Sequence, residues 1–170
     1  MKNSDYIEVI DIELKEGGDC HGDLILYIKT NDWKKNWKII VDSYYLALDG
    51  FYDPDNKTSD KIEVVLKQLL NNWILLVKEV KAGHNCYLPF DFSDQYTGWI
   101  KVFKESNEDL KLSYGYATLE GHRIHPSKLD HYRYIGDYEF IDLIEYETLE
   151  IKQGEFIKSI EKIIVKLNIK

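Results

Sequence analysis

Two pairs of neighbouring cysteine and histidine residues are the side chains of this sequence that most readily suggest chemistry. Cys20 precedes His21, and His84 lies two residues before Cys86. A histidine can activate a cysteine thiolate, and the four side chains together form a possible zinc-binding set. Adjacent residues of a strand point to opposite faces, however, and structural zinc sites usually contain closer cysteine pairs. We therefore expect two free thiols in a reducing compartment rather than a catalytic thiol or a metal centre.

A second group of candidates is the histidine-rich segment around residues 122–131. It contains His122, His125 and His131, together with Asp130. Histidine titrates near neutral pH and binds metals, so these side chains could form a metal site or a proton-transfer site. Their spacing matches no helical zinc signature, and Pro126 argues against a continuous helix. We expect a polar surface loop, and the alternative is an enzyme of unknown class that uses this loop.

Acidic and aromatic residues in two polar segments suggest a surface that binds a partner. Asp91, Asp94 and Tyr96 lie in the segment 91–99 between two predicted strands, and Trp33 and Trp37 lie among lysine, asparagine and aspartate residues. Exposed tyrosine and tryptophan are typical anchors of binding surfaces. Turn chemistry would also explain the first segment, and packing in the core would also explain the tryptophans. Contact of these five residues with a partner is therefore a hypothesis.

The charge of the chain bears on the class of partner. Thirty acidic and 22 basic residues give a net charge of −8, which argues against binding to a nucleic-acid backbone and permits a basic protein partner. The sequence contains no nucleophile elbow, Walker A loop or dinucleotide fingerprint, so we assign no catalytic residue and no cofactor.

Two features of hydropathy bear on location. The first residues of the chain carry charges and form no apolar core of a signal peptide. The longest strongly apolar run, residues 73–77, is too short to span a bilayer. We expect a cytoplasmic protein that does not bind membranes.

The spacing of apolar residues predicts the elements that must position these side chains. Alternating or β-branched stretches predict strands at residues 6–14, 23–30, 37–48, 86–92, 97–104 and 110–118, where Pro89 suggests an edge or a bulge. Apolar residues every three or four positions predict helices at 61–81 and 155–167. The pattern predicts irregular structure for residues 120–138. Residues 139–151 are ambiguous between a strand and a helix. The prediction is a single α+β domain over residues 1–170, with a largely antiparallel sheet packed against one long central helix and a C-terminal helix.

The order of these elements resembles the immunity proteins of bacterial polymorphic toxin systems. The resemblance is carried by the opening strand, a helix ending WILLV at 73–77, and LPFDFSD at 88–94 leading into GWI at 98–100. Such proteins bind one cognate toxin and block its active site. The resemblance implies a stoichiometric inhibitor of a basic toxin, without catalytic residues. A module that binds a small ligand or peptide is a further possibility.

Overall fold

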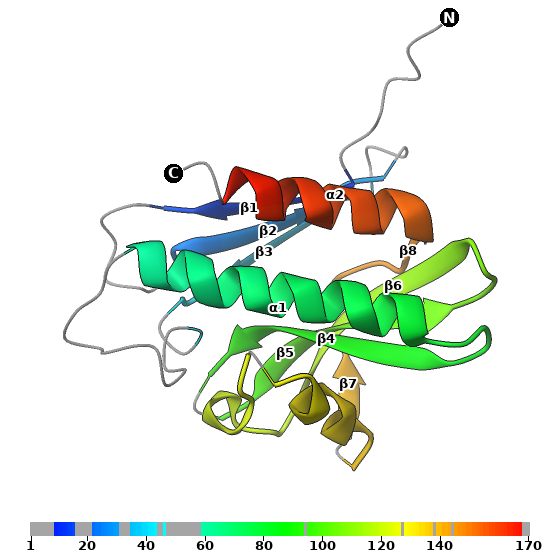
Figure 1. Cartoon of the computed structure of the whole chain (residues 1–170). Helices are drawn as coiled ribbons and strands as arrows, with labels where there is room; N and C mark the ends of the chain where they lie inside the picture. The colour runs from blue at the N-terminus through cyan, green and yellow to red at the C-terminus, as the bar shows by residue number, and fades with distance from the viewer. Residues whose placement is uncertain are drawn as a thin grey trace, which may run out of the picture.

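In the part of the chain that the structure describes, the strands form two antiparallel sheets, which two α-helices cover (Figure 1). The computed structural model describes residues 9–15, 22–30, 35–43, 46, 59–93, 95–126, 128–137, 139–143 and 145–167, without the side chains at 59–61, 122, 133, 134, 136 and 137. Within these residues the architecture confirms the predicted α+β class, its antiparallel pairing, and its long central and C-terminal helices.

The first sheet contains three strands in the order β1-β2-β3. They are β1 (Ile10–Leu14), β2 (Leu24–Ile28) and β3 (Trp37–Val41). In β3 the residues Trp37, Ile39 and Val41 are buried and the two between them are exposed, as expected for a strand with one face on the core.

The predicted strand at 37–48 is too long, because β3 ends at Val41. Asp23, just before β2, accepts hydrogen bonds from the backbone N–H of Ser43 at 2.9 Å and from its hydroxyl at 2.6 Å. The backbone N–H of Ser43 therefore bonds to a side chain rather than to the backbone of β2, and the ladder between β2 and β3 ends before this residue.

The second sheet is a meander of three strands whose last strand has two partners. The meander contains β4 (Asn85–Phe92), β5 (Thr97–Lys104) and β6 (Asp109–Ala117). One end of β6 pairs with β7 (Phe140–Asp142) and the other with β8 (Leu149–Lys152). The stretch predicted as ambiguous thus supplies two short strands.

Strand β4 forms an edge of this sheet, and its register shifts between Pro89 and Asp91. Proline has no N–H for the ladder, so both the edge and the bulge that Pro89 suggested are confirmed. The carbonyl of Pro89 accepts a hydrogen bond at 3.2 Å from the indole of Trp73, which is fully buried.

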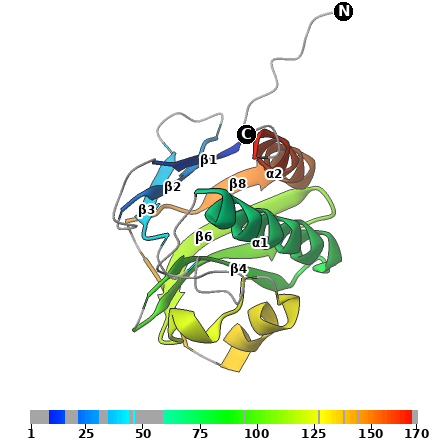
Figure 2. The same cartoon turned by 60° about the vertical axis from the view of Figure 1, so that its left-hand side comes forward.

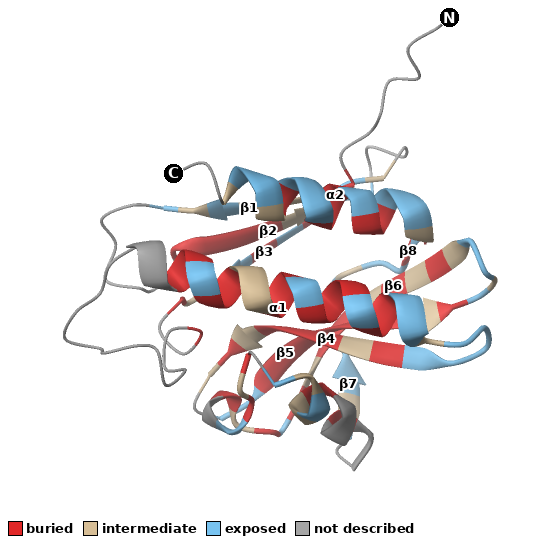
Figure 3. Ribbon diagram, in the orientation of Figure 1, coloured by how far each residue is buried: buried red, intermediate tan, exposed pale blue. Residues whose placement is uncertain are grey.

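The helices α1 (Ser59–Glu79) and α2 (Gln153–Lys166) pack side by side, α1 also against β4 and α2 against β1 and β8 (Figures 1 and 2). Figure 3 shows their buried residues along one face and exposed residues along the other. Both begin two residues earlier than predicted. Gly83, at a φ of +81°, turns the chain after α1 toward β4, and its N–H donates to the carbonyl of Lys104 at 2.8 Å.

The stretch predicted as irregular contains two 3-10 helices, η2 (Gly121–Arg123) and η3 (Leu129–Asp137). Both contact β4, and Tyr132 and Ile135 of η3 are buried. One hydrophobic cluster joins residues of both sheets and both helices. In the described part of the chain, neither helix combines the length and the apolar character needed to cross a bilayer.

Candidate functional site

A groove of about 330 Å³ opens where β3 of the first sheet meets the second sheet. Its walls contain Tyr96, Tyr114, Tyr116 and Tyr146 around the side chain of Asp91, and we call it the tyrosine groove. Apolar side chains from β3 and from the β7–β8 connection complete it, namely Ile39, Ile40 and Leu143. The groove therefore combines an acidic group with aromatic and aliphatic walls.

The groove exists because the chain leaves β6 between β7 and β8. Leu143 still donates its N–H to the carbonyl of Tyr114 at 2.9 Å, but the described residues 145–148 belong to no strand. Trp37 of β3 holds this connection in place, because its indole N–H donates to the carbonyl of Glu147 at 2.9 Å.

Trp37 also supports two of the tyrosines. Its ring centroid lies 6.4 Å from that of Tyr114 and 5.9 Å from that of Tyr146. Because Trp37 is 3% exposed, it is a buried support of the groove rather than a surface residue. A wall of aromatic rings held from behind in this way is preorganised for binding.

The backbone of β5 makes room for the acidic group. Gly98 pairs with Asp91 on one side and with Tyr116 on the other. Paired residues lie on the same face of a sheet, so the missing side chain of Gly98 leaves room for the hydroxyl of Tyr114 next to the β-carbon of Asp91.

Burial raises the pKa of Asp91 to about 6, an effect that the hydrogen bond from Tyr96 opposes and that the nearby Asp42 reinforces. The charge of Asp91 is in turn the largest cause that raises the pKa of Tyr96. Burial first, and then Asp91, hold the pKa of Tyr114 well above its ordinary value. At neutral pH the groove therefore presents a carboxylate beside the uncharged phenols of Tyr96 and Tyr114.

Two of the five proposed partner-binding residues, Asp91 and Tyr96, line this groove, and Trp37 lies behind it. Trp33 and Asp94 lie outside the described residues. The alternation of β6 had placed Tyr114 and Tyr116 on one face, but nothing in the sequence marked that face as part of a site. Tyr146 and Gly98 carried no signal that could have identified them.

Comparison of the chain with protein-family models, with curated proteins and with solved structures finds no match. The geometry of the groove, together with charge and chemistry, is therefore what supports a function.

The histidine-rich segment forms a folded turn beside α1. The backbone N–H of His125 donates to Nδ1 of His131 at 3.1 Å. The carbonyl of Pro126 accepts from the hydroxyl of Tyr132 and, at 3.1 Å, from Asn72 of α1. The side chain of His122 lies outside the described residues, and among those described no three His, Cys, Asp or Glu residues gather as a metal site would need.

The thiol of Cys86 is free and buried in β4, while Cys20 and His21 lie outside the described residues. Burial raises the pKa of the Cys86 thiol to about 12, although the charge of Lys104 slightly lowers it. A thiol with so high a pKa is a poor nucleophile at neutral pH, because the thiolate is the reactive form.

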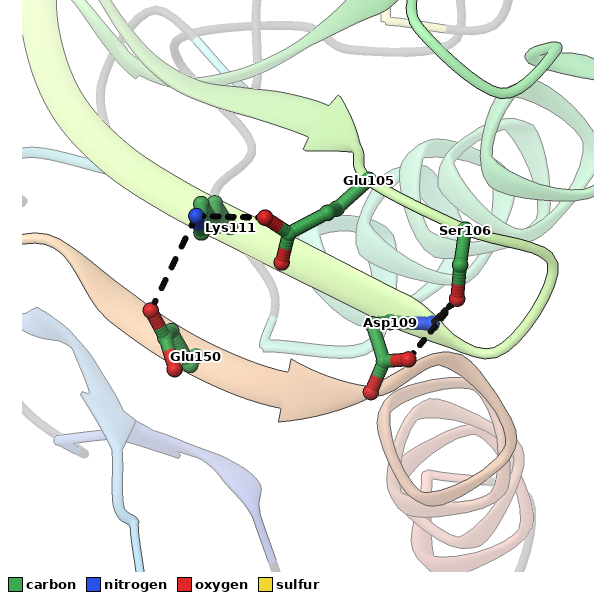
Figure 4. Close-up of polar contacts among 5 residues, drawn as sticks. All are labelled: Glu105, Ser106, Asp109, Lys111 and Glu150. Carbon is green, nitrogen blue, oxygen red and sulfur yellow. Dashed lines mark hydrogen bonds and ion pairs between the residues drawn. The ribbon is translucent and has the colours of Figure 1, made fainter.

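A cluster of charged side chains lies at the far end of β6 (Figure 4). Lys111 meets Glu105 at 2.6 Å and Glu150 of β8 at 3.8 Å. Asp109 accepts from the hydroxyl of Ser106 at 2.7 Å and from Lys152 of β8 at 2.5 Å. These charges pair with one another and so connect β6, β8 and the β5–β6 turn. The cluster therefore stabilises the sheet, and its presence requires no ligand.

Proposed function

We propose that this chain is a protein-binding module that holds a segment of a partner in the tyrosine groove. The observation that carries this proposal is a half-buried carboxyl group, Asp91, set among four tyrosines in a groove that opens to solvent. Tyrosine provides large contact area with few rotatable bonds, and it is enriched among the residues that dominate binding energy.

The charge of the whole molecule supports a basic partner. A net charge of −8 attracts cationic proteins over a distance and raises their rate of association. The exposed side chain of Ile40, at 52% exposure, and Tyr96, at 38%, add contact area at the rim of the groove.

We further infer that the partner is a toxin and that the module is its immunity protein, acting in the cytoplasm of a bacterium. Support comes from the resemblance in element order and from the acidic charge. The free thiol of Cys86 fits a reducing compartment. In this role the module would cover the active site of the toxin, and it would need no catalytic group of its own.

The test is co-expression of the chain with the products of neighbouring reading frames in the source genome. We expect one product to be toxic alone, to be tolerated with the chain, and to form a one-to-one complex in light scattering. Tyr96→Ala should weaken the complex and the rescue. Tyr27→Ala, which alters a tyrosine of β2 away from the groove, should leave both unchanged. A folded Tyr96→Ala variant that protects as well as the parent would overturn the proposed use of the groove.

A module that binds a small molecule is the second candidate, favoured by the volume of the groove. About 330 Å³ lies at the lower end of the range of roughly 300–1,000 Å³ for small-molecule sites. A metabolite that raises the melting temperature of the parent and not that of Tyr96→Ala would favour this candidate.

A further inference from the structure

We propose that the tyrosine groove binds the guanidinium group of an arginine side chain, between its tyrosine rings and the carboxylate of Asp91. This inference rests on the proposed function, because it names the chemical group that a protein partner would place in the groove. It is carried by three features of the described residues, which are the acceptor capacity of Asp91, the orientation of the tyrosine rings and the sign of the neighbouring charges.

The carboxylate of Asp91 has acceptor capacity that the described residues leave unused. An ionised carboxylate can accept about four hydrogen bonds. Among the residues that the structure describes, Tyr96 provides a hydrogen bond to Asp91 and no Lys, Arg or His contributes to its electrostatic environment. A half-buried carboxylate without a cation has lost part of its hydration, and a cationic ligand would compensate that loss.

The tyrosines form two edge-to-face pairs around this group. The rings of Tyr96 and Tyr116 lie 5.8 Å apart at 62°, and those of Tyr114 and Tyr146 lie 5.0 Å apart at 70°. In each pair one ring presents its edge to the face of the other, so the groove contains ring surfaces in several orientations. Aromatic faces attract cations, and the planar guanidinium group can stack on them while it bonds to a carboxylate in two places.

The surrounding charges select against other ligands. Asp42 raises the pKa of Asp91, and Glu145 lies in the groove wall beside Tyr146. An anion in the groove would meet two acidic side chains, Asp91 and Glu145, and a neutral ligand would leave the charge of Asp91 uncompensated. A cation is therefore the complement of this site.

The experiment is a titration of the full chain with two matched probes, followed by the NMR spectrum of the backbone amides. The probes are N-acetyl-arginine amide and N-acetyl-citrulline amide, which have nearly the same shape and differ in charge. We expect the arginine probe to shift the amides of residues 96–98 and 114–116 and to bind about tenfold more tightly than the citrulline probe, the difference expected from a charge-assisted hydrogen bond. Equal binding of the two probes would overturn the proposal, and this comparison requires no variant.

Two variants localise the effect. Asp91→Asn should weaken binding of the arginine probe by about tenfold, which is the factor expected between the arginine and citrulline probes. Asp11→Asn, which removes one charge from β1, should leave the affinity unchanged. The two variants have the same net charge, so a difference in affinity between them cannot come from general electrostatic attraction. Retention of full affinity by a folded Asp91→Asn variant would exclude the site.

The outcome is separable from that of the proposed function. If the probes bind equally while a partner complex still depends on Tyr96, the guanidinium site is wrong and the protein-binding role stands. If the arginine probe binds at Asp91 but no neighbouring product binds the chain, the site is correct and the proposed role is wrong.

Discussion

The hydroxyl oxygen of Tyr114 lies 2.5 Å from the point where a β-carbon on Gly98 would stand. The β-carbon of Asp91 lies 2.8 Å from the same point. Both distances are too short for carbon, so the side chains of Tyr114 and Asp91 occupy space that Gly98 leaves open. The tyrosine groove therefore depends on one glycine of β5, the strand that lies between Asp91 on β4 and Tyr114 on β6.

Gly98→Ala should destabilise the protein by about 1–3 kcal/mol, the usual cost of overpacking. Denaturation in urea measures the change. Adding Tyr114→Phe should recover part of the loss, because it removes the nearest atom, and a double-mutant cycle would report that coupling. The matched control is Gly154→Ala in α2, where nothing lies within 4 Å of an added β-carbon. It should change stability by no more than about 1 kcal/mol, in the stabilising direction.

The raised pKa of Asp91 predicts a specific dependence of stability on pH. The pKa of this carboxyl rises from 3.8 to about 6 on folding, so the folded state favours the protonated form. The parent should therefore lose stability as pH rises from about 4 to about 6, with no further loss from this group above that range. Two pKa units correspond to roughly 3 kcal/mol, which is an upper bound for the effect.

Asp91→Asn should lack this component. Its stability relative to the parent should increase through the same pH window, measured by urea denaturation at a series of pH values. A parallel pair of pH profiles would show that another group is responsible. If the prediction holds, the native fold maintains a carboxylate in the groove at a cost in stability, which is common for residues that bind ligands.

The Cys86 thiol should be nearly unreactive in the native protein. Its pKa of about 12, against an ordinary 9.0, reduces the thiolate fraction at pH 8 about a thousandfold. In a Cys20→Ser variant, Ellman's reagent should therefore react slowly in buffer and rapidly in guanidinium chloride. Rapid reaction in buffer would mean that the end of β4 opens often or that this thiol is accessible.

The charged cluster on β6 should contribute in a way that depends on salt. The side chains of Lys111, Glu105 and Glu150 are 35%, 47% and 76% exposed, so water and ions screen their interactions. Lys111→Met should lower the melting temperature slightly at low ionic strength, and the difference should vanish in about 1 M salt. A difference that persists in high salt would indicate that the aliphatic part of Lys111, rather than its charge, supports β6.

Periodicity in the sequence was sufficient to predict the helices and most of the strands. The apolar stripe through Trp73 has the spacing of a helix whose one face is buried, and that spacing is a local property of consecutive residues. The ends of elements were less predictable. The stop of β3 after Val41 depends on Asp23, about twenty residues earlier in the chain, and no local pattern records such a bond.

The sequence by itself determined the α+β class, the acidic charge, and two residues of the candidate site, Asp91 and Tyr96, which lie close together along the chain. The tertiary structure alone decided that Tyr114 and Tyr146 join them, that Trp37 is a buried support, and that Gly98 leaves the space that Tyr114 and Asp91 occupy. The physical reason is that a groove between two sheets is formed by strand register and by packing of segments distant in sequence. Those relationships follow from the whole fold, whereas hydrophobic spacing and turn chemistry report only on neighbours in the chain.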